Sequence, residues 1–469
     1  MIKNILLIVG LIILGLYGIS VVPTLSGRMQ LAAVISCIYI ISLAIIYPKI
    51  DFGFKFILII ISGYMLFGKR FAYLSPFEPI FISEICLAVS FIIVLGKILS
   101  KGLWGKLFDT PLHIIIWLLL IYGALHLYLG FPRYGIVAIK DSATIYYSLF
   151  FLISYILFQN KQLFYIFEKY LMWLFIIGLI GLIINRSYIP VISAFPFKDA
   201  YIGAASAGFL VIYFKTIRDR YYLGYIYLGI AIVFIMAALN MSVIWSLGFA
   251  ALLICIWARK YQLLYLLFAG VIFGGLFTAV ISALNPAIFE RIISEFDSMN
   301  LADLNITTYQ GSSTSGWRVA WWLAIWRETM LVNPWWGQGF GADLGSEFTL
   351  AFYGKAYGEF GNQAFGAARY PHNILFTVIG RLGLIGALLF IIYSTILLSY
   401  IYKFCKLFCS KSLYKIKLID IGIVAYIAAS FANAFVQCTY EAPYSAIPHW
   451  VMIAYMIVKI KNAKTLLTH

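Results

Sequence analysis

Apolar runs that recur along the whole chain are the feature that most limits what this sequence can fold into. Runs long enough to cross the ~30 Å of hydrocarbon in a bilayer begin a few residues from the N-terminus and continue almost to the C-terminus. The mean hydropathy is +0.96, and 63% of the 469 residues are hydrophobic. Because backbone groups in hydrocarbon must be hydrogen-bonded within their own segment, these runs predict an all-α, polytopic membrane bundle.

We identify about fourteen spans and expect twelve to fourteen transmembrane helices, because some runs are short and two have the length of re-entrant or tilted segments. The spans lie near residues 4–24, 30–48, 54–68, 79–98, 111–130, 142–158, 166–184, 199–215, 222–239, 241–257, 262–284, 372–402, 418–437 and 446–460. This pattern divides the chain into N-terminal membrane helices (1–284), a long periplasmic loop (285–371) and C-terminal membrane helices (372–469). No internal repeat is visible, which argues against a transporter built from inverted halves.

The net charge of +16 indicates membrane orientation, and nucleic acid is not expected as a partner. Twenty of the 34 basic residues fall in alternate loops, which is the positive-inside pattern of cytoplasmic loops. With this assignment both termini are cytoplasmic. The residues are Lys3, Lys49, Lys55, Lys97, Lys101, Lys106, Lys161, Lys215, Arg218, Arg220, Arg259, Lys260, Lys403, Lys406, Lys411, Lys415, Lys417, Lys459, Lys461 and Lys464.

The polar segment 285–371 interrupts the apolar pattern, and the charge bias places it on the exported side. A loop of this length is usually functional or disordered. Its stretch 311–316 has a flexible composition, whereas Trp317 to Val332 has the pattern of an amphipathic helix suited to the headgroup level. One face of that helix carries Arg318, Trp322, Ile325 and Thr329, with Trp321 and Trp326 beside it. Asn333-Pro334 then ends the helix, and Gly337, Gly339 and Gly341 predict a tight turn.

The six cysteines lie in or beside apolar segments, and none lies in the long loop. The sequence therefore indicates no disulfide framework. Cys405 and Cys409 lack the partner ligands that a metal site requires, so we interpret them as structural residues.

Ionisable residues on the exported side run against the orientation bias and are functional candidates for that reason. Arginine binds phosphate oxygens bidentately and stays protonated, so external arginines are suited to hold the diphosphate of a lipid-linked donor. A histidine near neutral pH is the usual base for an attacking hydroxyl. The candidates are Lys69, Arg70, Arg133, Lys140, Asp141, Arg186, Arg318, Arg369, His372 and Glu441.

Each candidate also has a purely structural interpretation. Arg133, Arg186 and Arg369 have side chains long enough to reach lipid headgroups, and Lys140 with Asp141 could form an ion pair that caps a span. A single histidine at a helix start is more often structural than catalytic. The tryptophans are more often interfacial anchors than platforms for sugars.

Several short motifs, in order along nearly the whole chain, resemble the superfamily of O-antigen ligases and Wzy O-antigen polymerases. The main ones are Gly316-Trp317-Arg318 at a helix start, Asn333-Pro334 before Gly337-Gln338-Gly339-Phe340-Gly341, and Pro371-His372-Asn373 before a long span. Supporting matches are Phe71-Ala72-Tyr73-Leu74, Phe81-Ile82-Ser83-Glu84, Lys140-Asp141-Ser142-Ala143 and Glu441-Ala442-Pro443. Each motif is weak alone, but the ordered set is fairly specific.

The resemblance implies a GT-C-like, inverting glycosyltransferase that uses an undecaprenyl-diphosphate-linked glycan and needs neither metal nor other cofactor. It implies that His372 activates the acceptor and that Arg318 contacts the diphosphate. Many members carry a Ser-Arg pair on a middle span, where this chain has residues 240–243 without arginine. We therefore expect Arg186 or Arg133 to supply the second contact. The remaining candidates for substrate binding are Lys140, Asn373, Arg369 and Arg70.

Three functions remain open at this point. The first is a polymerase that joins lipid-linked repeat units, with a chain-length regulator as a further candidate partner beside the membrane lipids. The second is a ligase with the same donor that transfers finished glycan to lipid A core. The third is a transporter or flippase of the same lipid-linked sugar, which the scarcity of charge within the spans disfavours, the notable mid-span charges being Glu84, Lys169 and Arg381.

Overall fold

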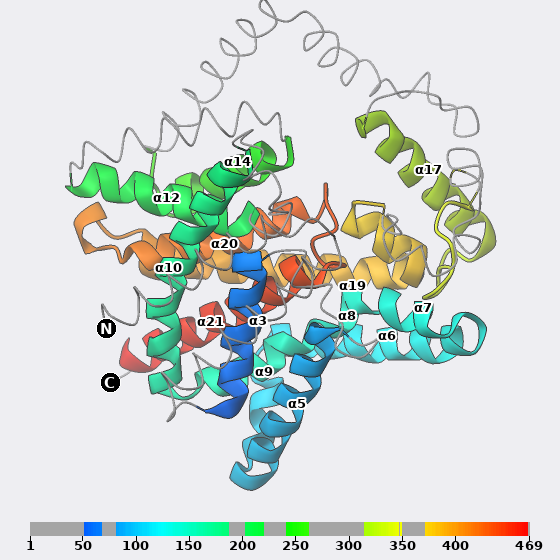
Figure 1. Ribbon diagram of the computed structural model, residues 1–469, viewed down its shortest axis with the longest axis horizontal. Helices are drawn as coiled ribbons and strands as arrows, with labels where there is room; N and C mark the ends of the chain where they lie inside the picture. The colour runs from blue at the N-terminus through cyan, green and yellow to red at the C-terminus, as the bar shows by residue number, and fades with distance from the viewer. Residues whose placement is uncertain are drawn as a thin grey trace, which may run out of the picture.

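The computed structural model of this chain describes residues 51–67, 81–186, 202–219, 241–261, 314–346, 348 and 371–467. Over these residues the regular elements are all helical, which confirms the all-α helical membrane bundle (Figure 1). The elements are α3 (Phe52–Phe67), α5 (Ile82–Lys101), η1 (Leu103–Phe108), α6 (Pro111–Tyr134), α7 (Ile136–Asp141), α8 (Ala143–Tyr146), α9 (Leu149–Phe158), α10 (Lys161–Arg186), α12 (Ile202–Asp219), α14 (Met241–Trp257), α17 (Thr314–Val332), α19 (Ile374–Phe404), η4 (Cys405–Cys409), η5 (Leu413–Lys415), α20 (Leu418–Asn433) and α21 (Pro443–Leu467).

Three helices of the described residues are long and apolar enough to cross a membrane: Ile82–Lys101, Pro111–Tyr134 and Ile374–Cys409. A fourth span results if Ile136–Tyr146 and Leu149–Phe158 count as one, although the chain bends by 43° between them. The predicted span 142–158 is therefore broken. The predicted spans 4–24, 30–48, 222–239 and 262–284 lie outside the described residues, so the total of twelve to fourteen stays a prediction.

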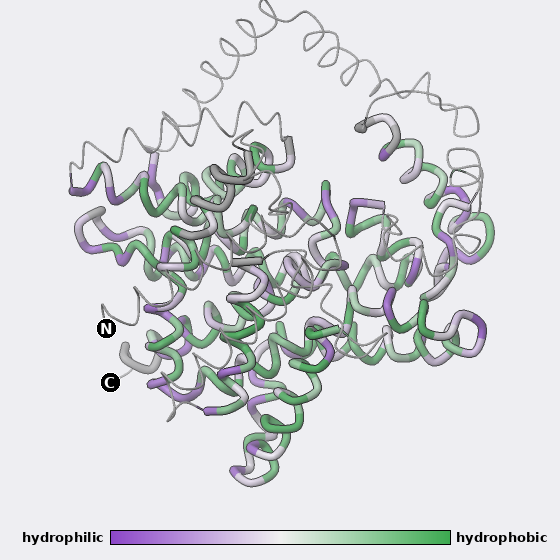
Figure 2. The backbone as a smooth tube through the Cα atoms, in the orientation of Figure 1, coloured by the Kyte–Doolittle hydropathy of each residue, from purple (hydrophilic) through white to green (hydrophobic). Residues whose placement is uncertain are grey.

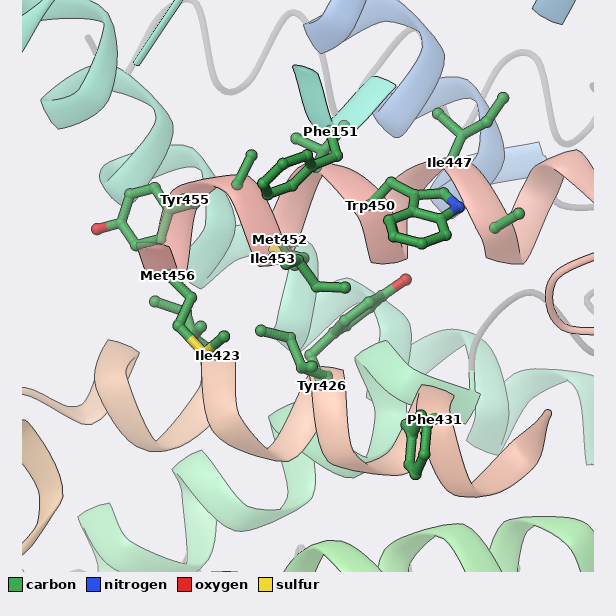
Figure 3. Packing of buried hydrophobic residues seen from close by; sticks show 14 of the residues in the cluster. Phe151, Ile423, Tyr426, Phe431, Ile447, Trp450, Met452, Ile453, Tyr455 and Met456 are labelled. Atoms are coloured by element: carbon green, nitrogen blue, oxygen red, sulfur yellow. The ribbon is translucent and has the colours of Figure 1, made fainter. Parts of the chain in front are cut away.

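The core forms where α12 packs against α10 and α20, α20 against α14, and α21 against α9. Tyr426 of α20 and Ile453 of α21 belong to this buried cluster (Figure 3). Close approach of α12 to α10 depends on Gly208, because a Cβ there would lie 2.2 Å from the carbonyl oxygen of Phe175. Figure 2 shows hydrophobic residues along most of the length of these helices and hydrophilic residues mainly near their ends.

Ion pairs connect helix ends on the side that the charge pattern assigns to the cytoplasm. Lys459 of α21 pairs with Asp420 of α20 and lies 3.5 Å from Glu168 of α10. Lys461 pairs with Asp109, which precedes α6. These contacts join segments for which the sequence predicts the same side of the membrane.

Helix α17 confirms the helix predicted from Trp317 to Val332. The face that carries Arg318, Trp322, Ile325 and Thr329 is half-buried to fully buried in protein. Trp321, Ile325 and Thr329 are fully buried, and Nε1 of Trp321 donates a hydrogen bond to the carbonyl oxygen of Leu344 at 2.7 Å. The buried part of this face therefore packs against protein, and its position at the headgroup level stays a prediction. The turn after α17 satisfies the indole N–H and supplies apolar contacts that a headgroup layer does not.

Helix α19 kinks at Gly383, where the backbone leaves helical geometry with φ +65°. The N–H groups of Leu384 and Ile385 donate to the carbonyl oxygens of Pro334 and Trp335, at 2.8 and 3.4 Å. A kink within a membrane helix is tolerated when another segment pairs the freed backbone groups. The turn that follows α17 does this for α19.

Candidate functional site

Segment 434–442, which joins α20 to α21 and is called here the 434–442 loop, receives side chains from two other helices. Nη1 of Arg318, in the first turns of α17, donates to the carbonyl oxygen of Val436 at 3.1 Å. Nδ1 of His372, just before α19, lies 3.2 Å from Oε1 of Gln437 and 3.3 Å from Sγ of Cys438. Three consecutive residues of this loop therefore bring Arg318 and His372 together.

The backbone of His372 is held in the left-handed region with φ +56°, which non-glycine residues seldom adopt. Such a conformation costs of order 1–3 kcal/mol and persists only where its surroundings impose it. Asn373 imposes it on one side, because its Oδ1 caps α19 by accepting the N–H of Leu375 at 2.9 Å. On the other side Nε1 of Trp322 donates to the carbonyl oxygen of Pro371. The imidazole thus projects from a fixed backbone.

Contact with Gln437 determines which nitrogen of His372 can act as a base. With Oε1 of Gln437 as the acceptor, Nδ1 carries the proton of the neutral ring. The lone pair then belongs to Nε2, the nitrogen that would take a proton from a hydroxyl. The ring is half-buried, so it combines a fixed orientation with access from one side.

A second cluster fastens the glycine turn at residues 337–341 to the kink of α19. Arg381 is buried, its Nη2 lies 2.8 Å from Oδ2 of Asp141, and its Nη1 donates to the carbonyl oxygen of Gly339 at 3.3 Å. Oδ2 of Asp141 also accepts the backbone N–H of Gly341 at 2.9 Å. Gly341 has φ +93°, and a Cβ there would lie 2.3 Å from Cβ of Tyr134, so the turn requires glycine at this point.

We expect Arg381→Met to lower the free energy of unfolding by about 3–5 kcal/mol, because it leaves the carboxylate of Asp141 buried without its cation. Thermal unfolding in detergent measures this. Adding Asp141→Asn should recover part of the loss. Lys106→Met is the matched control, since its pair with Asp109 at 3.6 Å is solvent-accessible and such pairs contribute less than about 1 kcal/mol. Equal small losses for the two single variants would contradict a stabilising role for the buried pair.

The other predicted site residues lie at separate places. Arg133 is exposed at the end of α6 and lies 5.1 Å from the ring centroid of Tyr134. Lys140 lies 5.5 Å from the ring centroid of Phe81, while its neighbour Asp141 pairs with Arg381. The suggested ion pair of Lys140 with Asp141 is thus replaced by a pair with Arg381. Outside the described residues lie Arg70, Arg369 and the side chain of Arg186, the last residue of α10.

Sequence analysis missed the partners that orient His372. Gln437 and Cys438 fell at the predicted end of a span, where polar residues are common and carry little information. Thr377 was also missed, although its Oγ1 lies 2.7 Å from Oε1 of Glu441. The available signal was the cluster of polar residues between Gln437 and Glu441, in a short external turn that is otherwise apolar.

Comparison with known proteins gives one family match. Residues 226–391 match the family model Wzy_C, described as O-antigen ligase. The match includes all of α14 and α17, the glycine turn, His372 and the first part of α19. No curated protein and no solved structure matched the chain. The family match confirms the resemblance first seen in the short motifs.

Proposed function

We propose that this integral membrane protein, whose residues 226–391 match the O-antigen ligase family model, polymerises undecaprenyl-diphosphate-linked repeat units. The family supports an enzymatic role of the ligase or polymerase type in O-antigen biosynthesis. The observation that supports glycosyl transfer from a diphosphate donor is the meeting of Arg318 and His372 at the 434–442 loop. Transfer of a glycan from a diphosphate to a hydroxyl needs a cation that binds the diphosphate and a base that takes the hydroxyl proton. Arg318 and His372 can supply these two groups.

In the proposed reaction, Nε2 of His372 takes the proton of the acceptor hydroxyl as its oxygen attacks the anomeric carbon of the donor. The new C–O bond forms on the face opposite the bond to the diphosphate, which breaks, so the anomeric centre inverts. The diphosphate leaves with its electron pair, and Arg318 stabilises the added charge. The proton then passes from His372 to water. Because the leaving group is already a stabilised diphosphate, the proposed mechanism uses no metal and no acid.

The proposed topology places this site on the periplasmic side of the inner membrane, with both termini in the cytoplasm. The ion pairs of Lys459 and Lys461 support it, because they join residues that the charge pattern assigns to one side. The contacts of Arg318 and His372 join residues that it assigns to the other side. No contact described here links the two groups.

A ligase that transfers glycan to lipid A core is the second candidate, because the matched family is described as O-antigen ligase. The third candidate, a transporter, finds less support in the charges within the spans. Glu84 accepts hydrogen bonds from the hydroxyls of Tyr146 and Tyr147, at 2.9 and 3.0 Å, and Arg381 is paired with Asp141. These charges serve packing contacts between helices, whereas a flippase needs them along a path through the membrane.

An acceptor exchange tests the proposal. Purified full-length protein receives labelled undecaprenyl-diphosphate-linked glycan together with either lipid-linked repeat units or lipid A core, in the presence of a chelator. We expect elongated lipid-linked glycan and no transfer to lipid A core. Transfer only to lipid A core would make the chain a ligase, and turnover that appears only without the chelator would contradict the metal-free mechanism.

A further inference from the structure

A carboxyl group is buried close to the helix start that carries His372. Glu441, at the end of the 434–442 loop, is 3% exposed, and its Oε1 lies 2.7 Å from Oγ1 of Thr377. Thr377 lies one turn into α19, and its Oγ1 is also 3.0 Å from the carbonyl oxygen of Asn373, the residue after His372. The three residues therefore form a chain of hydrogen bonds from the loop to the backbone beside the imidazole.

The number of hydrogens on this chain favours a protonated carboxyl group. Thr377 has one hydroxyl hydrogen but two oxygen neighbours, the carbonyl of Asn373 and Oε1 of Glu441. A carboxylate and a carbonyl both only accept, so the single hydroxyl hydrogen goes to one of them, while the carbonyl of Asn373 also accepts the N–H of Thr377 at 2.9 Å. A protonated Glu441 resolves the conflict, because it donates to Oγ1 while Thr377 donates to Asn373.

Burial of Glu441 also favours its protonated form. Because a buried charge loses its hydration, burial raises the pKa of the Glu441 carboxyl to about 7, against the smaller lowering effects of the Thr377 hydroxyl and of the backbone N–H groups of Tyr440 and Glu441. Oε2 of Glu441 is fully buried, and among the described residues nothing donates a hydrogen bond to it. Ionisable groups on the surrounding elements include Cys438 and Tyr440 of the same loop, His372 just before α19, Arg381 and Tyr393 on α19, Arg318 on α17, and Tyr444 and His449 on α21.

We propose that Glu441 acts as a carboxylic acid that positions His372 through Thr377 and Asn373, so that the enzyme works only while this acid keeps its proton. The inference rests on the proposed role of His372 as the base. When Glu441 ionises, Thr377 must turn its hydrogen towards the carboxylate. The carbonyl of Asn373 then loses its side-chain donor, and the strained backbone of His372 loses one of the contacts that hold it.

The test compares Glu441→Gln with Glu441→Ala in full-length protein in lipid nanodiscs. Glutamine keeps the shape and always carries a donor, so we expect turnover within about threefold of the unchanged protein. Alanine and Thr377→Val should each lower kcat by about 10- to 100-fold, since small misplacements of reacting groups have effects of this size. Thr377→Ser, which keeps the hydroxyl, is the matched control and should stay within about threefold.

The pH profile separates positioning from a general structural role. As pH rises through about 7, the unchanged protein should lose activity because Glu441 ionises, and Glu441→Gln should lack this loss. The dependence of activity on pH in the acid range should be the same in both proteins. Glu441→Gln as inactive as Glu441→Ala at equal folded yield, or the same loss at high pH in both proteins, would overturn the proposal.

Infrared spectroscopy tests the acid without any substrate. At pH 6 we expect a carboxylic-acid carbonyl band that is absent from Glu441→Gln and fades as pH rises through about 7. Absence of that band would overturn the proposed state of Glu441. If the band is present but the unchanged protein elongates no lipid-linked glycan, the proposed function fails while the assignment of the acid stands.

Discussion

His372→Ala should lower the rate of glycan elongation by about 10²–10⁴-fold, the usual effect of losing a general base. The reason is that His372 is half-buried and so open on one side, whereas His449, whose Nε2 lies 2.8 Å from the hydroxyl of Tyr440 in the same loop, is fully buried. Elongation of labelled lipid-linked glycan by the purified variant measures the loss. Binding of undecaprenyl diphosphate should be nearly unchanged, since the diphosphate is assigned to Arg318.

The left-handed backbone at this position calls for a second variant. Alanine removes the base but also tolerates φ +56° poorly, so its effect mixes two causes. Asparagine tolerates that backbone and has no basic nitrogen, so His372→Asn should be as inactive as His372→Ala. His126→Phe is the control, because His126 packs in α6 against the ring of Tyr122. Wild-type chain length and yield from His372→Asn would show that the imidazole is not the base.

Arg318→Lys should lower turnover by about 10²–10³-fold, the effect of removing one donor to the charge that develops in the transition state. Lysine keeps the positive charge but loses the planar fork that binds two phosphate oxygens. The specific measurement is product inhibition, because undecaprenyl diphosphate should inhibit the variant more weakly than it inhibits the unchanged protein.

Two controls separate substrate contact from anchoring of the loop. Arg327 lies on the same helix and is exposed, so Arg327→Lys makes the same chemical change away from the 434–442 loop and should have little effect. His372→Ala should keep normal inhibition by undecaprenyl diphosphate. Unchanged inhibition together with reduced turnover in Arg318→Lys would mean that Arg318 serves only to hold the carbonyl of Val436.

Hydropathy predicted the membrane helices well, because a span needs little more than length and apolar side chains. The predicted spans 79–98 and 372–402 correspond to α5 (Ile82–Lys101) and α19 (Ile374–Phe404). Hydropathy did not reveal the kink at Gly383 or the break before α9, since both depend on backbone partners from other segments. Glycine and a turn motif are visible in the sequence, but which backbone each one meets is not.

The site was predictable in its charged members and not in its neutral ones. An arginine or a histidine outside the membrane runs against the orientation bias, so Arg318 and His372 stood out. Gln437 and Thr377 are uncharged, so their position does not run against the orientation bias, and no pattern marked them. The burial of Trp321 was also missed, because an amphipathic pattern shows that one face is apolar but not whether lipid or protein covers it.

Helix α17 is attached to α19 at two places, in its middle and through the turn that follows it. Trp322 stacks on Phe376, with ring centroids 5.5 Å apart, and the turn after α17 pairs with the kink through Pro334 and Leu384. A long span tilts when the thickness of its bilayer changes. Any such tilt would move Arg318, so the geometry of the proposed site depends on the lipid mixture. Kinetic comparisons between variants are meaningful only in bilayers of one composition.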